Sequence, residues 1–115
     1  RLPHCWLEQD GRPVSTLDLC TPERFTLLTG IGGSAWTRAA KTVAALTGVA
    51  IEAKEIGLGL PVKDPYGDWA RLSEVEESGC VLVRPDHHVG WRCRRLPADG
   101  TAALEKAMRQ ILAKR

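Results

Sequence analysis

Residues 79–93 read GCVLVRPDHHVGWRC, and this stretch decides the fold prediction. The run Cys80–Val83 is apolar at every position, as expected for a strand that is covered on both faces. Pro85 and Asp86 then interrupt the run, and proline fits the first central position of a type I turn. His87 would follow with positive φ, which histidine tolerates and which closes a three-residue hairpin loop. We therefore predict two buried strands joined by a tight turn.

The loop length sets the register of this hairpin. A three-residue loop pairs Val83 with Val89 and Val81 with Trp91, which gives one apolar face. A two-residue loop would instead pair Val81 with Arg92 and bring charge into that face. We prefer the three-residue loop for this reason.

Four cysteines lie at positions 5, 20, 80 and 93, without a CxxC pair and without zinc-ligand spacing. The preferred register places Cys80 and Cys93 on opposite faces, whereas the other register would place them opposite each other. We therefore expect no disulfide between them. Four buried thiols in a reducing, cytoplasmic compartment are favoured over two disulfides.

The chain has 115 residues and a formal net charge of +2, which predicts one domain with a modest core. This charge does not favour a nucleic-acid or membrane partner, and no apolar run is long enough to span a bilayer. The sequence shows no signal-peptide pattern. Because it begins at Arg1 rather than at a methionine, we expect a fragment, a processed product or a trimmed chain.

A strand-helix-strand unit is predicted in the first half of the chain. Residues 25–29 form a strand, Gly30–Gly33 a flexible loop, and Ser34 the N-cap of a helix over 35–47. The apolar positions of this helix are Trp36, Ala39, Ala40, Val43 and Leu46. A second strand over 49–56 alternates, with Val49, Ile51 and Ala53 on one face. This order predicts parallel pairing with a right-handed crossover.

The remaining segments complete the fold prediction. Residues 1–14 are expected to be an extended arm and interdomain linker, and 15–19 a turn or short strand. Residues 57–79 are irregular, with a short helix near Trp69. A closing helix over 102–113 would bury Leu104, Met108, Ile111 and Leu112. We therefore predict an α/β fold over 15–115, a thioredoxin-like three-layer sandwich around a mixed central sheet.

Gly30, Gly32 and Ala35 match GxGxxA between a strand and a helix, and Glu52 follows at a suitable distance. This pattern is typical of dinucleotide sites, so a small nucleotide-binding module that uses Gly30–Ala35 stays an alternative. The competing interpretation is a turn that lets the helix pack close to the strand.

A stand-alone thiol-redox protein of thioredoxin-like fold is a further alternative. Such enzymes place a reactive cysteine at this strand-to-helix junction, where the helix N-terminus lowers its pKa. Residues 29–36 contain no cysteine, and Ser78-Gly79 occupies the place of the usual cis-proline. Both differences argue against redox chemistry.

The histidines and arginines near the hairpin carry no clear site. We expect His87 and His88 to be exposed turn residues, because no carboxylate or cysteine is spaced to complete a metal site. Arg92, Arg94 and Arg95 are interpreted as a solvated edge.

Short motifs are spread along nearly the whole chain. They are RLPHxWL at 1–7, STLDL at 15–19, FTLL at 25–28, Trp36, VLVRPD at 81–86 and VxWR at 89–92. In order and spacing they resemble the C-terminal domain of FAD-dependent aromatic-ring hydroxylases, the phenol-hydroxylase-like and polyketide-tailoring flavoprotein monooxygenases. The sequence departs from that family at His87-His88, where a glycine is typical of the turn.

The resemblance implies a thioredoxin-like domain without the redox cysteine pair. It implies a parent enzyme that uses FAD, NAD(P)H and O2 to hydroxylate an aromatic substrate, with the flavin-binding and substrate domains upstream. The chain itself would then hold no catalytic, cofactor-binding or metal-binding residue. Its role would be to pack on those domains or to support homodimer contacts, with Pro3, His4 and Trp6 as candidates for the interdomain contact.

Overall fold

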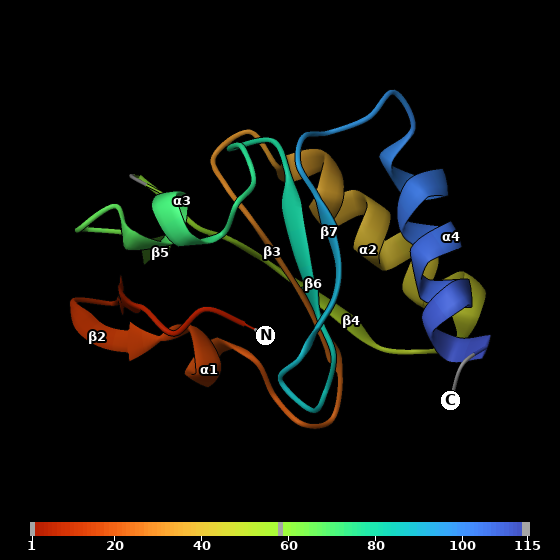
Figure 1. The fold of residues 1–115 in the computed structure, drawn as a ribbon, viewed down its shortest axis with the longest axis horizontal. Helices are drawn as coiled ribbons and strands as arrows, with labels where there is room; N and C mark the ends of the chain where they lie inside the picture. Colours follow the sequence, from red (N-terminus) through yellow and green to blue (C-terminus); the bar gives the residue numbers. More distant parts are fainter. Residues whose placement is uncertain (1, 58, 114–115) are drawn as a thin grey trace.

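The computed structural model describes residues 2–57 and 59–113, and a four-stranded mixed sheet forms its centre (Figure 1). The strand order is β4-β3-β6-β7, with β3 at Phe25–Thr29, β4 at Ile51–Glu55, β6 at Cys80–Val83 and β7 at Val89–Cys93. β3 and β4 are parallel, whereas β6 is antiparallel to both β3 and β7. The predicted strand-helix-strand unit and hairpin therefore share one sheet.

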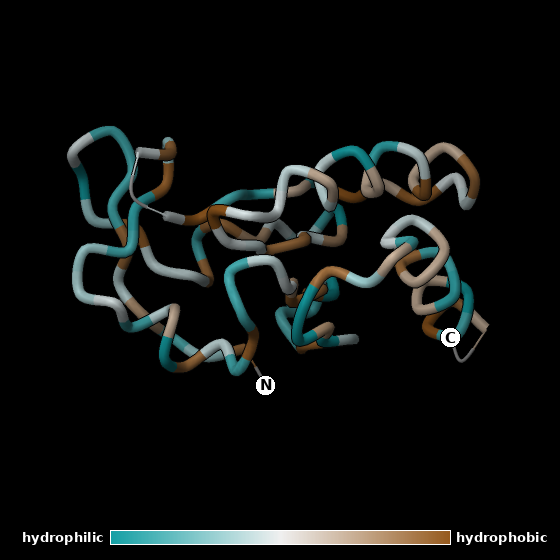
Figure 2. The backbone as a smooth tube through the Cα atoms, turned by 90° about the horizontal axis from the view of Figure 1, so that it is seen from above, coloured by the Kyte–Doolittle hydropathy of each residue, from teal (hydrophilic) through white to brown (hydrophobic). Residues whose placement is uncertain are grey.

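Two helices cover one face of this sheet. α2 (Ser34–Thr47) and α4 (Gly100–Ala113) bury their apolar sides against β3 and β6. The buried set is Phe25, Leu27, Trp36, Ala39, Ala40, Val43, Cys80, Leu82, Leu104 and Met108. The helices in Figure 2 alternate between hydrophobic and hydrophilic segments, as expected for helices with one buried side.

The predicted apolar positions of these elements are largely confirmed. Val49, Ile51 and Ala53 pack together against the helix-side cluster. Leu46 is an exception, since its side chain is 55 % exposed. The buried side of α2 runs from Val43 to the half-buried Thr47 one turn later and leaves Leu46 outside.

A smaller layer covers the other face of the central sheet. It contains the sheet β2-β1-β5, with β1 at Trp6–Gln9, β2 at Arg12–Ser15 and β5 at Val62–Lys63, and the helices α1 (Thr16–Leu19) and α3 (Asp68–Leu72). Its buried set is Leu2, Cys5, Leu7, Leu19, Cys20, Leu28, Ile56, Val62, Trp69, Val81 and Val83. The molecule is thus a three-layer α/β sandwich with the thioredoxin-like strand order. Every residue of β3 and β6 is buried because both layers cover these strands.

The prediction of an extended arm over 1–14 is wrong in its local structure. Trp6 pairs with Ser15 and Gln9 with Arg12 in an antiparallel hairpin, and β1 also pairs with β5. Asp10 and Gly11 form the turn with φ of 54° and 76°. An Asp-Gly pair favours this type I′ turn, so the signal was present in the sequence.

Of residues 15–19, predicted as a turn or short strand, Ser15 ends β2 and Thr16–Leu19 form one turn of α-helix, α1. Ser15 is its N-cap in a capping box with Asp18. The Asp18 N–H donates to Ser15 Oγ at 3.2 Å, and the Ser15 N–H donates to Asp18 Oδ2 at 3.1 Å.

The loop of the β6–β7 hairpin has the predicted length. The Arg84 N–H donates to the His88 carbonyl at 2.8 Å, and the His87 N–H donates to the Arg84 carbonyl at 2.9 Å. His87 has a φ of 68°, the left-handed conformation expected at the third loop position. Histidine therefore supports the turn where a glycine is typical.

The register beyond the first pair differs from the prediction. Val83 faces Val89 as predicted, but a bulge then shifts β7 so that Leu82 faces Trp91. Without the shift, Trp91 would lie on the same side as Val83, in the smaller layer. The bulge turns it toward the helices, where it packs edge-to-face on Trp36 with ring centroids 5.9 Å apart.

The middle of the chain contains the short helix predicted near Trp69, which is α3, and Leu58 lies outside the described residues. Within residues 2–57 and 59–113, no helix is both long and apolar enough to cross a membrane.

Candidate functional site

The glycine-rich junction between β3 and α2 is closed by its own backbone. The Gly30 N–H donates to the Glu77 carbonyl at 3.1 Å, and the Gly33 N–H donates to the Gly30 carbonyl at 3.1 Å. A Cβ at Gly33 would overlap the side chain of Thr29, and a Cβ at Gly30 would lie 2.7 Å from the Glu77 oxygen. These glycines therefore allow close packing, which was the competing interpretation of the motif.

Ser34 is not the N-cap that the sequence predicted. Gly33 occupies that position without a side-chain cap, and the Trp36 N–H donates to its carbonyl at 2.9 Å. The helix therefore begins at Ser34, one residue earlier than predicted, and Gly33 fits against Thr29 where a larger residue would clash.

The described residues do not fit a dinucleotide or FAD cradle at this junction. Glu52 lies inside β4, where it pairs with Thr26 of β3, and not at the end of the strand. Its carboxylate lies 3.4 Å from both Arg24 and Lys54. A cavity of about 220 Å³ lies beside Gly30, and Asp64, Glu76 and Glu77 are among its lining residues. Three carboxylates would repel a pyrophosphate.

Ser78 and Gly79, which stand where redox enzymes of this fold have a cis-proline, are fixed by other contacts. The indole of Trp36 donates to the Ser78 carbonyl at 2.7 Å, and the Thr29 hydroxyl donates to the Gly79 carbonyl. A Cβ at Gly79 would overlap the carbonyl oxygens of Cys93 and Arg94. The segment before the hairpin is thus fixed by buried hydrogen bonds and by a glycine.

All four cysteines are free, and one of them, Cys80, pairs with Thr29 at the end of β3. Burial raises the pKa of Cys5 and of Cys20 to about 11, and it raises the pKa of Cys80 still further. These three thiols are therefore protonated at neutral pH and are weak nucleophiles. Cys93 is half-buried, and its thiol donates to the Arg95 carbonyl at 3.1 Å.

The bulge also corrects the prediction for the hairpin cysteines. Cys80 and Cys93 are directly opposite each other in the β6–β7 pair, not on opposite faces. The prediction failed because the inserted residue, Gly90, restores the pairing that a two-residue loop would have produced. Both thiols are nevertheless free.

The histidines of the turn have different environments. The Nε2 atom of His87 lies 3.0 Å from the Cys20 carbonyl oxygen, so His87 is half-buried and ties the hairpin to the end of α1. His88 is exposed as predicted, with its Nδ1 atom 3.4 Å from Asp86 Oδ1. The described part of the chain holds no cluster of three or more residues suited to a metal ion.

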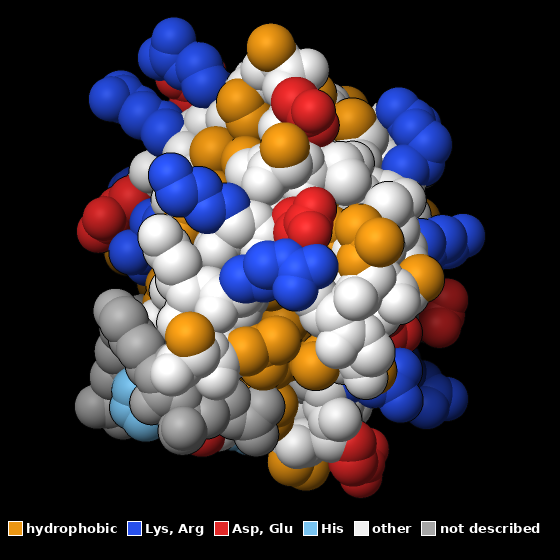
Figure 3. Space-filling model, turned by 90° about the vertical axis from the view of Figure 1, so that its right-hand side faces the viewer, with side chains coloured by type: hydrophobic (Ala, Val, Ile, Leu, Met, Phe, Trp, Pro, Cys, Tyr) orange, Lys and Arg blue, Asp and Glu red, His pale blue; other side chains and the backbone are white. Residues whose placement is uncertain are grey.

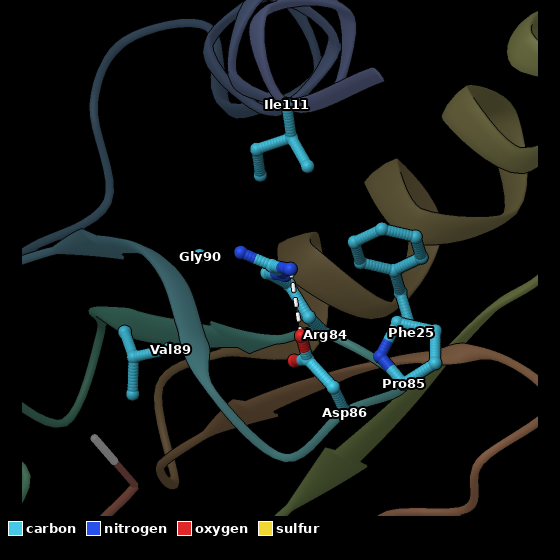
Figure 4. A pocket seen from close by; sticks show the side chains of 7 residues that line it. All are labelled: Phe25, Arg84, Pro85, Asp86, Val89, Gly90 and Ile111. Atoms are coloured by element: carbon cyan, nitrogen blue, oxygen red, sulfur yellow. Dashed lines mark hydrogen bonds and ion pairs between the residues drawn. The ribbon is translucent and has the colours of Figure 1, made fainter. Parts of the chain in front are cut away.

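A hollow of about 430 Å³ lies between the hairpin turn and α4 (Figure 4). Arg84 and Asp86 line it and form an ion pair at 2.6 Å, while Ile111 extends toward it from α4. A Cβ at Gly90 would lie 3.0 Å from Ile111 Cδ1 and 3.1 Å from Arg84 Cγ, so both of these side chains would have to shift slightly to admit it. The lining charges neutralise each other, so this hollow does not select a charged ligand.

The arginines at the end of β7 and just after it are paired with their own chain. Arg95 lies 2.8 Å and Arg94 3.7 Å from Glu76 Oε2, and the Arg92 guanidinium donates to the Ser73 carbonyl at 3.0 Å. On the face shown in Figure 3, Lys and Arg side chains alternate with acidic and hydrophobic ones instead of forming a stripe. Neither region resembles a nucleic-acid footprint.

The most exposed aromatic side chains gather on the smaller layer. Trp6 is 52 % exposed and Tyr66 is 75 % exposed, and both line an open hollow of about 500 Å³ together with Pro13 and Pro65. His4 packs edge-on against Trp6 with ring centroids 5.5 Å apart. Aromatic residues that leave such area in water are typical of interfaces. We call Trp6, Pro13, Pro65 and Tyr66 the aromatic surface.

Sequence reasoning found only part of this surface. Trp6 and His4 were expected to make contacts outside the domain, and both reach its exterior. Pro3 is half-buried, and its carbonyl accepts from the Thr16 hydroxyl at 2.7 Å. Tyr66 was missed, although a single aromatic residue within the polar turn 64–68 was a usable signal.

Comparison with known proteins identifies the family of the chain. The profile described as "Aromatic-ring hydroxylase, C-terminal" matches residues 1–114. The chain belongs to this family. It is also 50 % identical over 113 residues to the 2,4-dichlorophenol 6-monooxygenase of Cupriavidus pinatubonensis JMP 134, and 50 % identical over 104 residues to the phenol 2-monooxygenase of a Pseudomonas strain.

A solved relative of the aromatic-ring hydroxylase C-terminal domain has the same fold. The flavin-dependent monooxygenase PieE, in complex with FAD and substrate, superposes with a TM-score of 0.90 and 50 % identity over the whole of this chain. The chain spans 20 % of PieE, 19 % of the dichlorophenol enzyme and 17 % of the phenol enzyme. It therefore corresponds to one domain of these longer relatives.

Proposed function

We propose that this domain is a non-catalytic support of a FAD- and NAD(P)H-dependent aromatic hydroxylase. Its aromatic surface would pack against the upstream FAD-binding and substrate domains of the same chain. The flavin, the nicotinamide and the aromatic substrate would bind to those domains. The domain itself would hold no cofactor, and the glycine junction would be structural.

The exposed aromatic surface is the observation that carries this proposal. Trp6 and Tyr66 lie on the smaller layer, on the opposite side of the central sheet from α2 and α4. In an isolated domain this exposure has no structural use, whereas an interface would remove the ring area from water. Because the relatives are about five times longer than this chain, a large covering surface in the same polypeptide is expected.

The segment that carries Trp6 is ordered before any contact forms. The Thr16 N–H donates to the Cys5 carbonyl at 3.1 Å, and the Cys5 N–H donates to the Thr16 hydroxyl at 3.3 Å. His4 also supports the indole ring from its side. A side chain that is held in place loses less conformational entropy on binding, which strengthens the contact.

Substitution of Trp6 in the full-length enzyme tests this proposal. Trp6→Ala should lower the midpoint of thermal unfolding and of FAD release, and should increase cleavage by protease between this domain and the rest of the chain. Truncation of a buried interface tryptophan typically costs about 2 kcal/mol or more. Leu46→Ala is the matched control, because Leu46 is 55 % exposed but lies on α2.

The isolated domain provides the second comparison. There Trp6→Ala should change the free energy of unfolding by less than about 0.5 kcal/mol, as at other surface positions. Equal effects of Trp6→Ala and Leu46→Ala on the full-length enzyme would contradict the proposal. A large loss of stability in the isolated domain would show instead that Trp6 acts within the domain.

A further inference from the structure

Two cysteines of the central sheet face each other across neighbouring strands. Cys80 is the first residue of β6 and Cys93 is the last residue of β7, and the bulge sets them directly opposite each other. Side chains of directly opposite residues lie on the same face of a sheet, with Cβ atoms about 4.5 to 5.5 Å apart. Both side chains accordingly pack with the cluster on the helix side. The two thiols therefore share one face and one end of the hairpin.

The spacing of this pair is close to that of a disulfide. A disulfide joins Cβ atoms about 3.5 to 4.5 Å apart and Cα atoms about 4.4 to 6.8 Å apart, and opposite residues of an antiparallel pair have Cα atoms about 4.5 to 5.5 Å apart. An approach of about 1 Å between the two side chains is therefore sufficient. The strands already lie close together here, because a Cβ at Gly79 would overlap the Cys93 carbonyl oxygen.

The two thiols differ in their access to solvent. Cys80 is 0 % exposed, whereas Cys93 is half-buried and its thiol donates to the Arg95 carbonyl at 3.1 Å. Burial also raises the pKa of Cys80 well above its usual range, so that thiol is a weak nucleophile toward a dissolved oxidant. Cys5 and Cys20 are buried in the smaller layer, and neither belongs to a strand. An oxidant in solution therefore reaches Cys93 first.

We propose that Cys93 is an oxidation site for hydroperoxides and that Cys80 is its resolving thiol. Hydrogen peroxide oxidises the Cys93 thiol to a sulfenic acid, its O–O bond breaks, and one water leaves. The Cys80 sulfur then attacks the Cys93 sulfur, the S–O bond breaks, and the hydroxide leaves as a second water with the Cys80 proton. Two thiols are thereby oxidised to one disulfide, while one peroxide is reduced to two waters. This site goes beyond the proposed function and does not depend on it, because the aromatic surface lies on the other side of the central sheet.

The pairing makes the oxidation of Cys93 reversible. A sulfenic acid without a thiol partner is oxidised further to sulfinic and sulfonic acids, which ordinary thiols do not reduce. A disulfide is instead returned to two thiols by thiol–disulfide exchange. Formation of the disulfide also takes the Cys93 proton from the Arg95 carbonyl and so removes that hydrogen bond. Cys80 therefore stops the oxidation at a stage from which the reduced hairpin can be restored.

A peptide map of the full-length enzyme under non-reducing conditions tests the site. The enzyme is treated with hydrogen peroxide, its remaining thiols are alkylated, and it is digested with trypsin. Since Pro85 blocks cleavage after the preceding arginine, Cys80 lies in a peptide over 72–92 and Cys93 in a peptide over 93–94. These two peptides should become linked, with the loss of two titratable thiols, and dithiothreitol should separate them again.

Two variants separate the roles of the two thiols. In Cys80→Ala the sulfenic acid at Cys93 has no partner, so dimedone should trap it in larger amount than in the wild-type enzyme, and dithiothreitol should no longer restore the thiol after prolonged oxidation. In Cys93→Ser the thiol of Cys80 should stay reduced, because it is buried. Cys20→Ala is the control, since it removes a buried thiol from the smaller layer and should leave the linkage unchanged.

The wild-type map decides the proposal even where a variant folds poorly. Peptides 72–92 and 93–94 that stay unlinked in the oxidised wild-type enzyme would overturn it. So would a disulfide that joins Cys93 to a different cysteine, or oxidation of Cys80 at the wild-type rate in Cys93→Ser. Trp6→Ala should leave the linkage as it is, so this inference and the interdomain proposal stand or fall on different results.

Discussion

Gly33→Ala tests the structural interpretation of the glycine junction. The new Cβ would overlap the Oγ1, Cγ2 and Cβ atoms of Thr29, whose hydroxyl holds the Gly79 carbonyl. Thr29 is buried and cannot turn away without breaking that bond. Overpacking of this kind costs about 1 to 3 kcal/mol, and the lost hydrogen bond adds about 1 kcal/mol. We therefore expect a loss of about 3 kcal/mol in the free energy of unfolding.

Gly32→Ala is the matched control within the same loop. Its Cβ would meet only Ser78 at 3.7 Å, which is ordinary contact. Loss of the freedom of glycine in the unfolded chain would offset any small strain, so the free energy of unfolding should change by less than about 0.5 kcal/mol. In a nucleotide-binding loop Gly32→Ala would instead weaken cofactor binding, because in the GxGxxA pattern Gly32 is the glycine that lets the cofactor approach.

Urea unfolding of the 115-residue chain measures both changes. Tryptophan fluorescence follows the transition, since the buried Trp36 lies next to the junction. Gly33→Ala should shift the midpoint strongly to lower urea with little change in slope. Wild-type stability of Gly33→Ala, or equal losses in both variants, would refute the packing argument.

Two further predictions concern the smaller layer. Thr16→Val keeps the shape of a fully buried side chain but removes its hydrogen bonds to the Pro3 carbonyl and the Cys5 N–H. The free energy of unfolding in urea should therefore fall by about 1 to 3 kcal/mol. An unchanged urea midpoint would contradict this prediction. Burial raises the pKa of Cys20 from 9.0 to about 11 in the folded chain. As pH rises from 9 toward 11, this thiol ionises in the unfolded chain before it ionises in the folded chain, so the free energy of unfolding should fall. This loss should be about 1 kcal/mol smaller in Cys20→Ala between pH 8 and pH 10, as measured by urea midpoints.

Several elements were predictable from local sequence. The apolar run over 80–83 indicates a strand covered on both faces, and β6 is buried throughout. The spacing of Trp36, Ala39 and Val43 indicates one buried helix side, and Gly48 ends α2 with a φ of 72°. These features depend on neighbours within a few residues, so the chain itself determines them.

The N-terminal hairpin shows where local reasoning stopped short. Asp10-Gly11 is a strong hairpin signal, yet two proline residues in the segment favoured an extended arm. The hairpin forms on an outer sheet in which Pro13 lies on the edge strand β2, where a missing N–H costs no ladder bond. Pairing with β5, more than fifty residues later, completes that sheet.

For the candidate sites, too, some features were predictable from the sequence and others arise only in the tertiary structure. The sequence alone established the family through ordered short motifs, and it identified Trp6 as an exterior contact. Only the tertiary structure brought Tyr66 beside Trp6 and, through the bulge, set Cys80 opposite Cys93. Each of these features depends on segments that are distant in sequence, which local periodicity does not encode.

The hairpin at 79–93 most clearly separates what the local sequence determines from what tertiary packing determines. Its strands, its three-residue loop and the positive φ of His87 follow from the local sequence. Its register does not, because the bulge at Gly90 exists to turn Trp91 toward Trp36, which lies 55 residues earlier in the chain. Packing of that half-buried indole on Trp36 of α2 stabilises the shifted register, so tertiary packing decided what the turn alone left open.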